Sequence, residues 1–166
     1  GEPELELAKP KDSLYRVTVT LTGDVADTDA NRVDRVQHVF IQINNQHSRS
    51  FGRGVTINSD YIVLFTACGP VTEAAYRTVL QMNALRLKPE SLPKQPFGFT
   101  QGSLGIFQDE FVMIDTQATQ QVTRDSIYNG IRVLATLGDE IERKLTGGAD
   151  RSEDEVEEKL IGENLA

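Results

Sequence analysis

Histidine, cysteine, serine and paired carboxylates carry most of the chemistry done by protein side chains, and this sequence offers few of them in useful combinations. Its two histidines, His38 and His47, have no Cys, Asp or Glu between them. A metal site needs more ligands than this pair supplies, so the sequence predicts neither a metal site nor a cofactor. His47 is close in sequence to Arg49 and Arg53. These residues form a polar hairpin lip that could bind a small ligand together with His38.

The other reactive groups have structural interpretations. Cys68 ends a strongly apolar run and has no cationic neighbour in sequence, which predicts a buried, inert thiol. The run Gly102-Ser103-Leu104-Gly105 lies inside a predicted strand, not at the strand-to-helix turn of a nucleophile elbow. Asp109 belongs to a predicted turn, and Glu110 and Asp115 are interpreted as surface charges. With no phosphate loop, dinucleotide fingerprint or HExxH motif, the sequence predicts a protein that is not an enzyme.

Composition further narrows the class of protein to which this chain can belong. The 166 residues, 39% of them hydrophobic, suit one ordinary domain. A net charge of −8 argues against binding to nucleic acid. No apolar run approaches the roughly 20 residues that a membrane span needs. The single cysteine and the lack of a leader pattern favour a cytoplasmic protein.

The elements that must position these groups are first of all strands. Period-two alternation predicts strands over 14–22, 36–44, 51–58 and 61–68, joined by turns at 45–50 and 59–60 into an antiparallel meander. His38 is expected on an open sheet face. A hairpin is predicted over 97–107 and 110–116, closed at Gln108-Asp109.

An amphipathic helix is predicted over 72–87, and its apolar face is broader than one contact with a sheet requires. Excess apolar surface usually marks a partner. We therefore interpret as partner or dimer contacts Tyr76, Val79, Leu80, Met82, Asn83 and Leu87. Asn83, the polar member of this stripe, is expected to hydrogen-bond sheet backbone under the helix. The alternative is a contact between two helices that fixes their register.

A second helix begins at the predicted cap Thr123 and ends at Gly147-Gly148. Its apolar stripe is the strongest periodic signal in the chain: Ile127, Ile131, Leu134, Gly138, Ile141 and Leu145. The pairs Asp139–Arg143 and Glu140–Lys144 are expected on its exposed side.

The predicted domain spans 14–147. Residues 1–13, broken by Pro3 and Pro10, are interpreted as an extended N-terminal arm that could add an edge strand. Residues 148–166 hold seven acidic and two basic residues and are interpreted as a solvated acidic tail that could dock through its few apolar residues. The predicted fold class is α+β, with about six antiparallel strands and two main helices in the order β-β-β-β-α-β-β-α.

Three segments carry a family resemblance: the helix Val79-Leu80-Gln81-Met82-Asn83-Ala84, the hairpin over 97–116, and the ending Gly138-Asp139-Glu140-Ile141-Glu142. Over 72–150, about half of the chain, this pattern resembles the type III secretion chaperone-like family. The resemblance implies a twisted antiparallel sheet packed by helices, often in a homodimer that binds an extended segment of another protein. Family dimers commonly use the middle helix, here 72–87, or the sheet beside it. The family's opening helix has no counterpart in 1–13.

The leading hypothesis is therefore a non-enzymatic, chaperone-like protein-binding module. It would form a homodimer and capture a segment of an unidentified protein partner. The alternative is a small-molecule binding protein or enzyme that uses the polar sheet face and the lip near His38, His47, Arg49 and Arg53. A third hypothesis is a structural subunit tethered to a larger assembly by the acidic tail.

Overall fold

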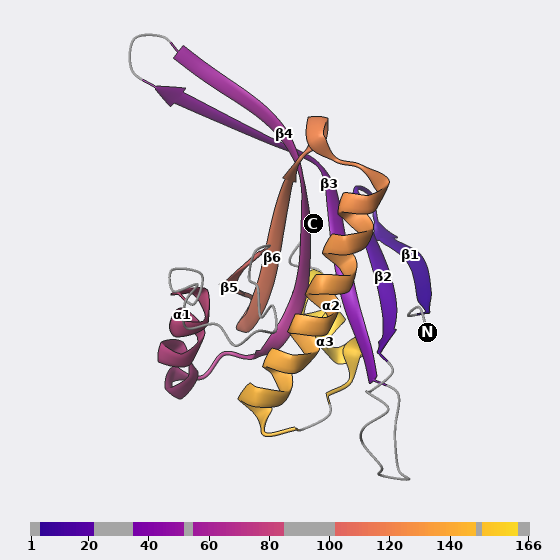
Figure 1. The fold of residues 1–166 in the computed structure, drawn as a ribbon, viewed down its shortest axis with the longest axis vertical. Helices are drawn as coiled ribbons and strands as arrows, with labels where there is room; N and C mark the ends of the chain where they lie inside the picture. Colours follow the sequence, from indigo (N-terminus) through magenta and orange to yellow (C-terminus); the bar gives the residue numbers. More distant parts are fainter. Residues whose placement is uncertain (1–3, 22–34, 52–54, 85–101, 149–150, 163–166) are drawn as a thin grey trace.

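The computed structural model describes residues 4–21, 35–51, 55–84, 102–148 and 151–162, with the backbone alone for 44–51, 55–59 and 84. Six strands form one antiparallel sheet in the order β1-β2-β3-β4-β6-β5 (Figure 1). The strands are β1 Leu5–Lys11, β2 Leu14–Leu21, β3 Arg35–Phe51, β4 Val55–Pro70, β5 Ser103–Phe107 and β6 Glu110–Ala118. The helices are α1 Tyr76–Ala84, α2 Arg124–Thr146 and α3 Glu153–Ile161, with single 3-10 turns at Glu73–Ala75 and Thr119–Gln121. The predicted α+β class is confirmed.

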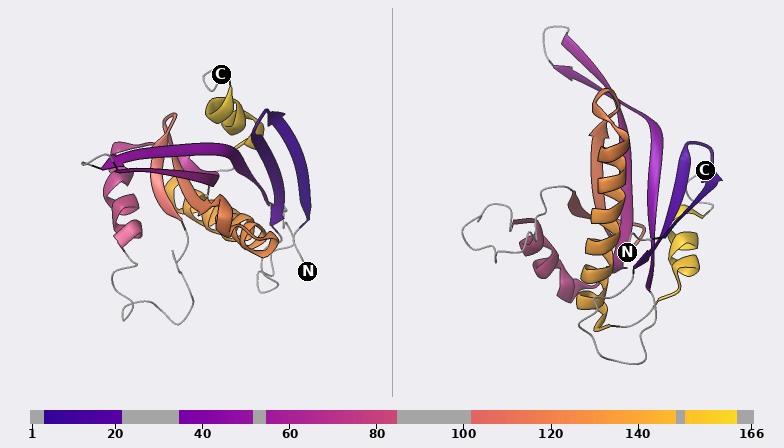
Figure 2. Two further views of the ribbon diagram at one scale, coloured as in Figure 1. Left: turned by 90° about the horizontal axis from the view of Figure 1, so that it is seen from above. Right: turned by 45° about the vertical axis from the view of Figure 1, so that its right-hand side comes forward.

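The two faces of the sheet are covered by different helices. Seen from above, α2 lies on one side of the strands and α3 on the other (Figure 2). Val17, Val39 and Leu64 of the strands belong to the core on the α2 side, together with Leu134 of α2. Leu14, Phe40 and Val112 belong to a second core with Leu160 of α3. Alternate residues of a strand point to opposite faces, so β2, β3, β4 and β6 each contribute side chains to both cores.

The β3–β4 hairpin is longer than the sequence pattern indicates. The predicted turns at 45–50 and 59–60 are wrong, because both segments lie within the strands β3 and β4. Residues 46–51 and 55–60 pair only with each other, whereas β2 and β6 pair with the parts of β3 and β4 nearer the sheet centre. The hairpin therefore projects beyond the sheet (Figure 1). Outside the sheet these residues pair only with each other, through backbone hydrogen bonds, so the polar segment 45–50 lacks the period-two pattern by which the other strands were predicted.

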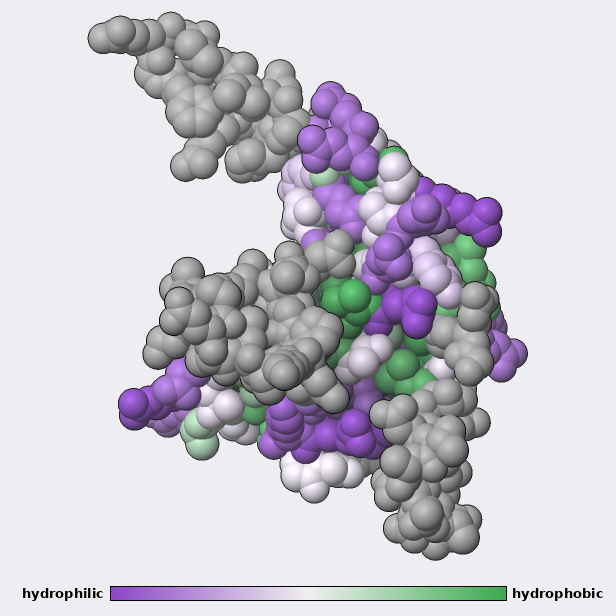
Figure 3. Space-filling view, in the orientation of Figure 1, coloured by the Kyte–Doolittle hydropathy of each residue, from purple (hydrophilic) through white to green (hydrophobic). Residues whose placement is uncertain are grey.

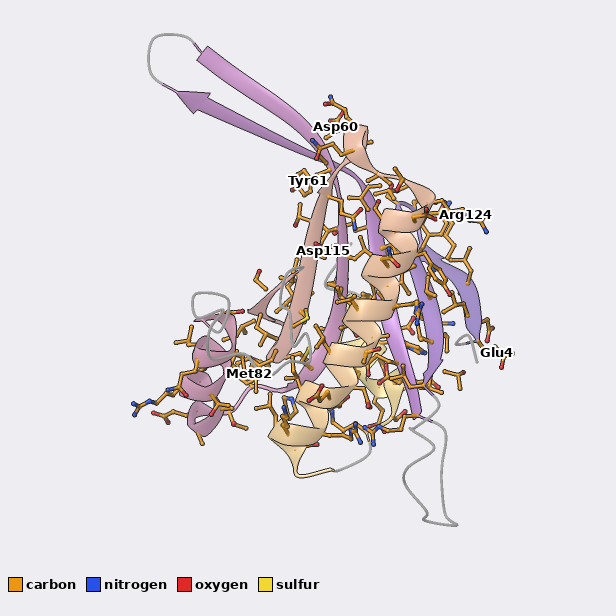
Figure 4. The ribbon with its side chains drawn as sticks, in the orientation of Figure 1. Glu4, Asp60, Tyr61, Met82, Asp115 and Arg124 are labelled. Atoms are coloured by element: carbon orange, nitrogen blue, oxygen red, sulfur yellow. The ribbon has the colours of Figure 1, made fainter. Side chains whose placement is uncertain are left out.

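The hairpin leaves the sheet at the end where α2 begins. Figure 4 shows Asp60 and Tyr61 at the base of the projection, at the same end as Arg124, the first residue of α2. Tyr61 still pairs with Ala118 of β6, whereas Asp60 pairs with Gln46 of β3.

Both chain ends extend the domain beyond the predicted 14–147. Residues 5–11 form the edge strand β1, which pairs with β2 through a turn at Asp12-Ser13. Within the segment 148–166, interpreted as a solvated tail that could dock through its few apolar residues, residues 153–161 form the docked helix α3. Val156, Leu160 and Ile161 of this helix are buried against the sheet. Full burial of such a side chain is worth about 1.5–3 kcal/mol, enough to hold a short helix in place.

Helix α2 has the predicted ends. Thr123 and Ser126 form a reciprocal capping box, and Gly147 ends the helix in a left-handed conformation with φ of 69°. Gly138 brings the helix close to the sheet, because a Cβ there would lie 2.7 Å from Thr66 Cγ2. The helix is therefore packed more tightly on β4 than any larger residue at this position would allow.

The β5–β6 hairpin closes at the predicted residues. Gln108 and Asp109 have φ values of 51° and 59°, the pair of positive angles typical of a type I′ turn. Helix α1 lies beside β5 at this edge of the sheet, and Met82 is on the side of α1 that packs against the core (Figure 4).

In the coloured part of Figure 3, hydrophobic residues gather near the middle, with mostly hydrophilic residues above and below them. Within the described ranges, no helix has the length and apolar character of a membrane span.

Candidate functional site

Helix α1 carries most of the predicted contact residues, and the structure divides them into two groups. Val79 is buried in the core, and Met82 packs partly against it. Tyr76 and Leu80 remain 42% and 68% exposed, although the Tyr76 ring also meets Phe111 edge-on at 6.0 Å. Leu87 lies outside the described residues. The predicted contact face is therefore partly intramolecular, with Tyr76 and Leu80 as its outward part.

Asn83 does what the sequence predicts. Its side-chain Nδ2 donates to the backbone oxygen of Leu104 at 3.0 Å, and its Oδ1 accepts from the Leu104 amide at 2.8 Å. Leu104 lies in β5, the last strand of the sheet, so Asn83 takes the place of a neighbouring strand at this residue. The Leu104 backbone groups are consequently not available for pairing with another chain.

The predicted ligand lip lies mostly outside the described residues. His38 and His47 both belong to β3, nine residues apart, which places them about 30 Å apart along the strand. His47 pairs with Ser59 and Arg49 with Ile57, both in the projecting hairpin. The side chains of His47 and Arg49, and all of Arg53, lie outside the described residues. The structure thus separates His38 from the backbone of His47 and Arg49.

His38 does not lie on an open sheet face, because α3 covers it and leaves it 7% exposed. Its Nδ1 is 3.3 Å from Glu157 Oε2, and Arg16 Nη1 donates to the same carboxylate oxygen at 2.6 Å. The backbone amide of His38 donates to Glu153 Oε2 at 3.0 Å, and its carbonyl accepts from the Thr66 hydroxyl at 2.7 Å. Helix α3 therefore satisfies a backbone amide at the end of the β3–β4 ladder, where pairing begins only at Phe40.

Burial is the main cause of the pKa shifts of His38 and Glu153. It lowers the pKa of His38, although the neighbouring Glu157 acts in the opposite direction. Burial raises the pKa of Glu153 to about 7, against the hydrogen bond from the His38 amide. Both shifts favour the neutral side chains, because a charged group loses hydration in a buried site.

A second ionic cluster joins three elements through Arg151, just before α3. Arg151 Nε donates to Glu142 Oε1 of α2, and Nη1 donates to Glu110 Oε1 of β6 at 2.8 Å. Lys159 of α3 is 2.9 Å from the same Glu110 oxygen. Glu110 is only 1% exposed, so its interpretation as a surface charge is wrong, and Asp115 is also largely buried.

A third cluster lies at the start of β3. Arg35 Nε donates to Asp139 Oδ1 of α2, and Arg143 Nε is 3.3 Å from Asp139 Oδ2. Asp139 is 6% exposed, so the predicted i,i+4 pair is present but not on the exposed side of the helix. The pair Glu140–Lys144 is also present, at 3.0 Å.

An open pocket of about 280 Å³ lies at the N-terminal end of α3, between the segment 151–154 and β3. Arg35, Val36 and His38 line it from the strand. Four buried polar atoms make no hydrogen bond within the described part of the chain: Arg16 Nε, His38 Nδ1, Glu110 Oε2 and Arg151 Nη2. All four belong to the α3 seam, which we define as α3, its flank Arg151-Ser152 and the sheet residues that these contact.

The other candidate chemical groups occupy structural positions. Cys68 is fully buried, as predicted, and burial raises the pKa of its thiol. Ser103 is exposed within β5 and not on a strand-to-helix turn. In the ranges that the structure describes, no three His, Cys, Asp or Glu side chains are grouped to hold a metal ion.

Sequence reasoning allowed the segment 148–166 to dock through its few apolar residues, but it did not predict the helix or its ionic partners. The signal for the helix was the spacing of Val156, Leu160 and Ile161, which puts three apolar side chains on one face of a short helix. The charged partners in β2, β3 and β6 are 41–141 residues away in sequence, and no local pattern connects them.

Comparison with known proteins adds no relative. No protein-family model matches the chain, and no curated protein matches it significantly. What the coordinates define is therefore a class of fold: an α+β domain with an open, antiparallel six-stranded sheet that has a helix on each face.

Proposed function

We propose that this chain is a non-enzymatic, chaperone-like protein-binding module that forms a homodimer through its α1–β5 edge. One observation carries the proposal. Of the six large hydrophobic side chains exposed in the described part of the chain, Tyr76, Leu80 and Ile106 lie in α1 and β5. Ile106 pairs with Phe111 across the ladder, and Tyr76 meets the ring of the same Phe111, so two of the three flank one core residue.

The mode of contact follows from Asn83. Because its side chain occupies the Leu104 backbone, a second copy would meet this edge through side chains, not by adding a strand at that residue. An isologous contact would place the same exposed residues on both partners. The resemblance to the type III secretion chaperone-like family agrees with this arrangement, since family dimers commonly use the corresponding helix.

The test is the solution mass, measured by light scattering on a size-exclusion column. We expect a mass twice the 18.4 kDa of one chain for the unmodified protein. Leu80→Asp should give a folded monomer, because Leu80 is 68% exposed and contributes little to the core. Thr78→Asp, an exposed position on the same helix, is the matched control and should remain dimeric. A protein that is monomeric before any substitution, or a Leu80→Asp variant that stays dimeric, would refute the assignment.

A further inference from the structure

An apolar strip runs along the second face of the sheet, under α3. Its floor is made by residues of four strands: Leu14, Phe40, Ala67 and Val112. Val156, Leu160 and Ile161 of α3 fill it and are each no more than 6% exposed. The strip therefore accepts a helix whose apolar residues have i, i+4 and i+5 spacing.

The strip also selects charge. On the β1–β3 side, Arg16 meets Glu157 at 2.6 Å, and Lys11 Nζ donates to the carbonyl of Gly162 at 2.8 Å. Arg16 and Lys11 thus give the strip a basic rim beside Glu157 and the C-terminal end of the docked helix, and this complementarity defines the helices that the strip can bind.

Helix α3 is weakly held by its own sequence. It has nine residues, fewer than the roughly 12–15 at which an isolated helix becomes marginally stable, and its N-cap Ser152 makes no side-chain capping bond. Gly147 and Gly148, which precede it, have left-handed backbone conformations with no heavy atom near the position of a Cβ. Because the helix depends on docking for its structure, its local opening requires less free energy than opening of the sheet.

One apolar position of this sheet face lies beyond the N-terminus of α3. Val36 lines the pocket of about 280 Å³ there, among polar residues, and is 41% exposed. Val36 lies two residues before His38 on β3, and therefore on the same face. A longer helix could cover this apolar position as well.

We propose that the strip is a binding groove for an acidic amphipathic helix of a partner protein, and that α3 occupies the groove within the chain until the partner displaces it. The proposal rests on the proposed function as a protein-binding module and names the face and the partner chemistry. It uses the α3 face and not the α1–β5 edge, so each can fail without the other.

The experiment compares the full-length protein with its full-length Leu160→Asp variant, in which α3 should leave the groove. The probe is a fluorescein-labelled peptide of residues 151–162, and binding is followed by anisotropy. A competitor within the chain reduces apparent affinity by the fraction of molecules in which the groove is open. We therefore expect the variant to bind the peptide at least about tenfold more tightly than the unmodified protein.

The charge pattern provides matched controls. A Glu157→Lys peptide should bind the Leu160→Asp protein about tenfold more weakly or worse, because its lysine would face Arg16. A Glu158→Lys peptide carries the same charge change on the exposed side of the helix and should bind about as well as the original. Adding Arg16→Glu to the protein should restore binding of the Glu157→Lys peptide.

Three results would overturn the proposal. The first is a folded Leu160→Asp variant that binds the peptide no better than the unmodified protein. The second is a dimer that Leu160→Asp dissociates and Leu80→Asp does not, because the occupant would then be α3 of a second copy. The third result applies if Leu160→Asp does not fold, and it is measured by hydrogen exchange of the unmodified protein. Amides of α3 should exchange far faster than those of α2, and exchange only through global unfolding would refute a displaceable helix.

Discussion

Arg151 should be the most costly charged residue to remove from the described part of the fold. Its guanidinium donates to Glu142 of α2 and to Glu110 of β6, two carboxylates that are 3% and 1% exposed. The substitution Arg151→Met keeps an apolar stem and deletes the charge. It leaves Glu142 as a buried carboxylate without its hydrogen-bond donor, whereas Glu110 keeps the ammonium of Lys159 at 2.9 Å.

The expected loss of stability follows from this difference between Glu142, which loses its partner, and Glu110, which keeps Lys159. Removing one member of a buried ion pair costs about 3–5 kcal/mol, because the other charge remains desolvated. Since Lys159 still compensates Glu110 and the Arg151 side chain is 20% exposed, we expect the lower end, about 3 kcal/mol. This is a large part of the roughly 5–15 kcal/mol by which domains are stable.

The loss should depend on pH. Burial raises the pKa of Glu142, while Arg151 acts to lower it, so removal of Arg151 should raise this pKa further. An acid with a raised pKa in the folded state holds its proton longer than in the unfolded state. It therefore costs stability as the pH rises above its ordinary value of 4.5. The cost of Arg151→Met should be about 3 kcal/mol at pH 7.5 and below about 1 kcal/mol at pH 4.

Equilibrium urea unfolding at the two pH values measures this difference. The control is Lys144→Met, which removes a cation 3.0 Å from Glu140 on the surface and should change the free energy of unfolding by less than about 0.5 kcal/mol. Adding Glu142→Gln to Arg151→Met should restore most of the stability, because it removes the unpaired charge. A loss below about 1 kcal/mol at pH 7.5, or a loss of equal size at both pH values, would refute the reasoning.

Two further predictions concern the contacts on either side of the sheet. Glu153→Gln keeps an oxygen for the His38 amide and removes a carboxyl group whose pKa is raised to about 7. Thermal unfolding should therefore show that the substitution stabilises the protein by about 2–3 kcal/mol at pH 8 and by little at pH 4. An equal effect at both pH values would contradict it. Gly138→Ala should cost about 1–2 kcal/mol in chemical denaturation through its 2.7 Å contact with the Thr66 methyl group. Thr66→Ser, which removes that methyl group and keeps the hydroxyl, should reduce the cost, and additive effects of the two substitutions would count against the contact.

If the α3 seam has the role proposed here, the chain combines two surfaces of different character. The α1–β5 edge presents apolar side chains around Phe111 and suits a second copy of the same edge. The opposite face carries a groove with a basic rim that its own acidic helix fills. Self-association and partner binding could then be changed independently, by Leu80 on one side and Arg16 on the other.

The sequence alone determined the features that depend on local periodicity and on residues with special backbone or capping chemistry. The stripe from Ile127 to Leu145 sets which face of α2 is buried, because helical spacing fixes that face wherever the helix docks. Local sequence also predicted the helix ends at Thr123 and Gly147 and the turn at Gln108-Asp109, because capping and positive φ are properties of short segments. Asn83 could be predicted to bond sheet backbone, because a polar side chain on an apolar face must find a partner.

Only the tertiary structure decided the rest. The polar segment 45–50 forms a strand because it pairs with 56–61, a contact that its own sequence does not show. The acidic segment 153–161 forms a docked helix because Arg16, His38 and the apolar strip converge on its inner face from distant parts of the chain. Glu110 and Asp139 became buried charges for the same reason. A charged side chain can leave water only where the fold supplies a counter-charge, and that supply is a property of three-dimensional neighbours and not of sequence spacing.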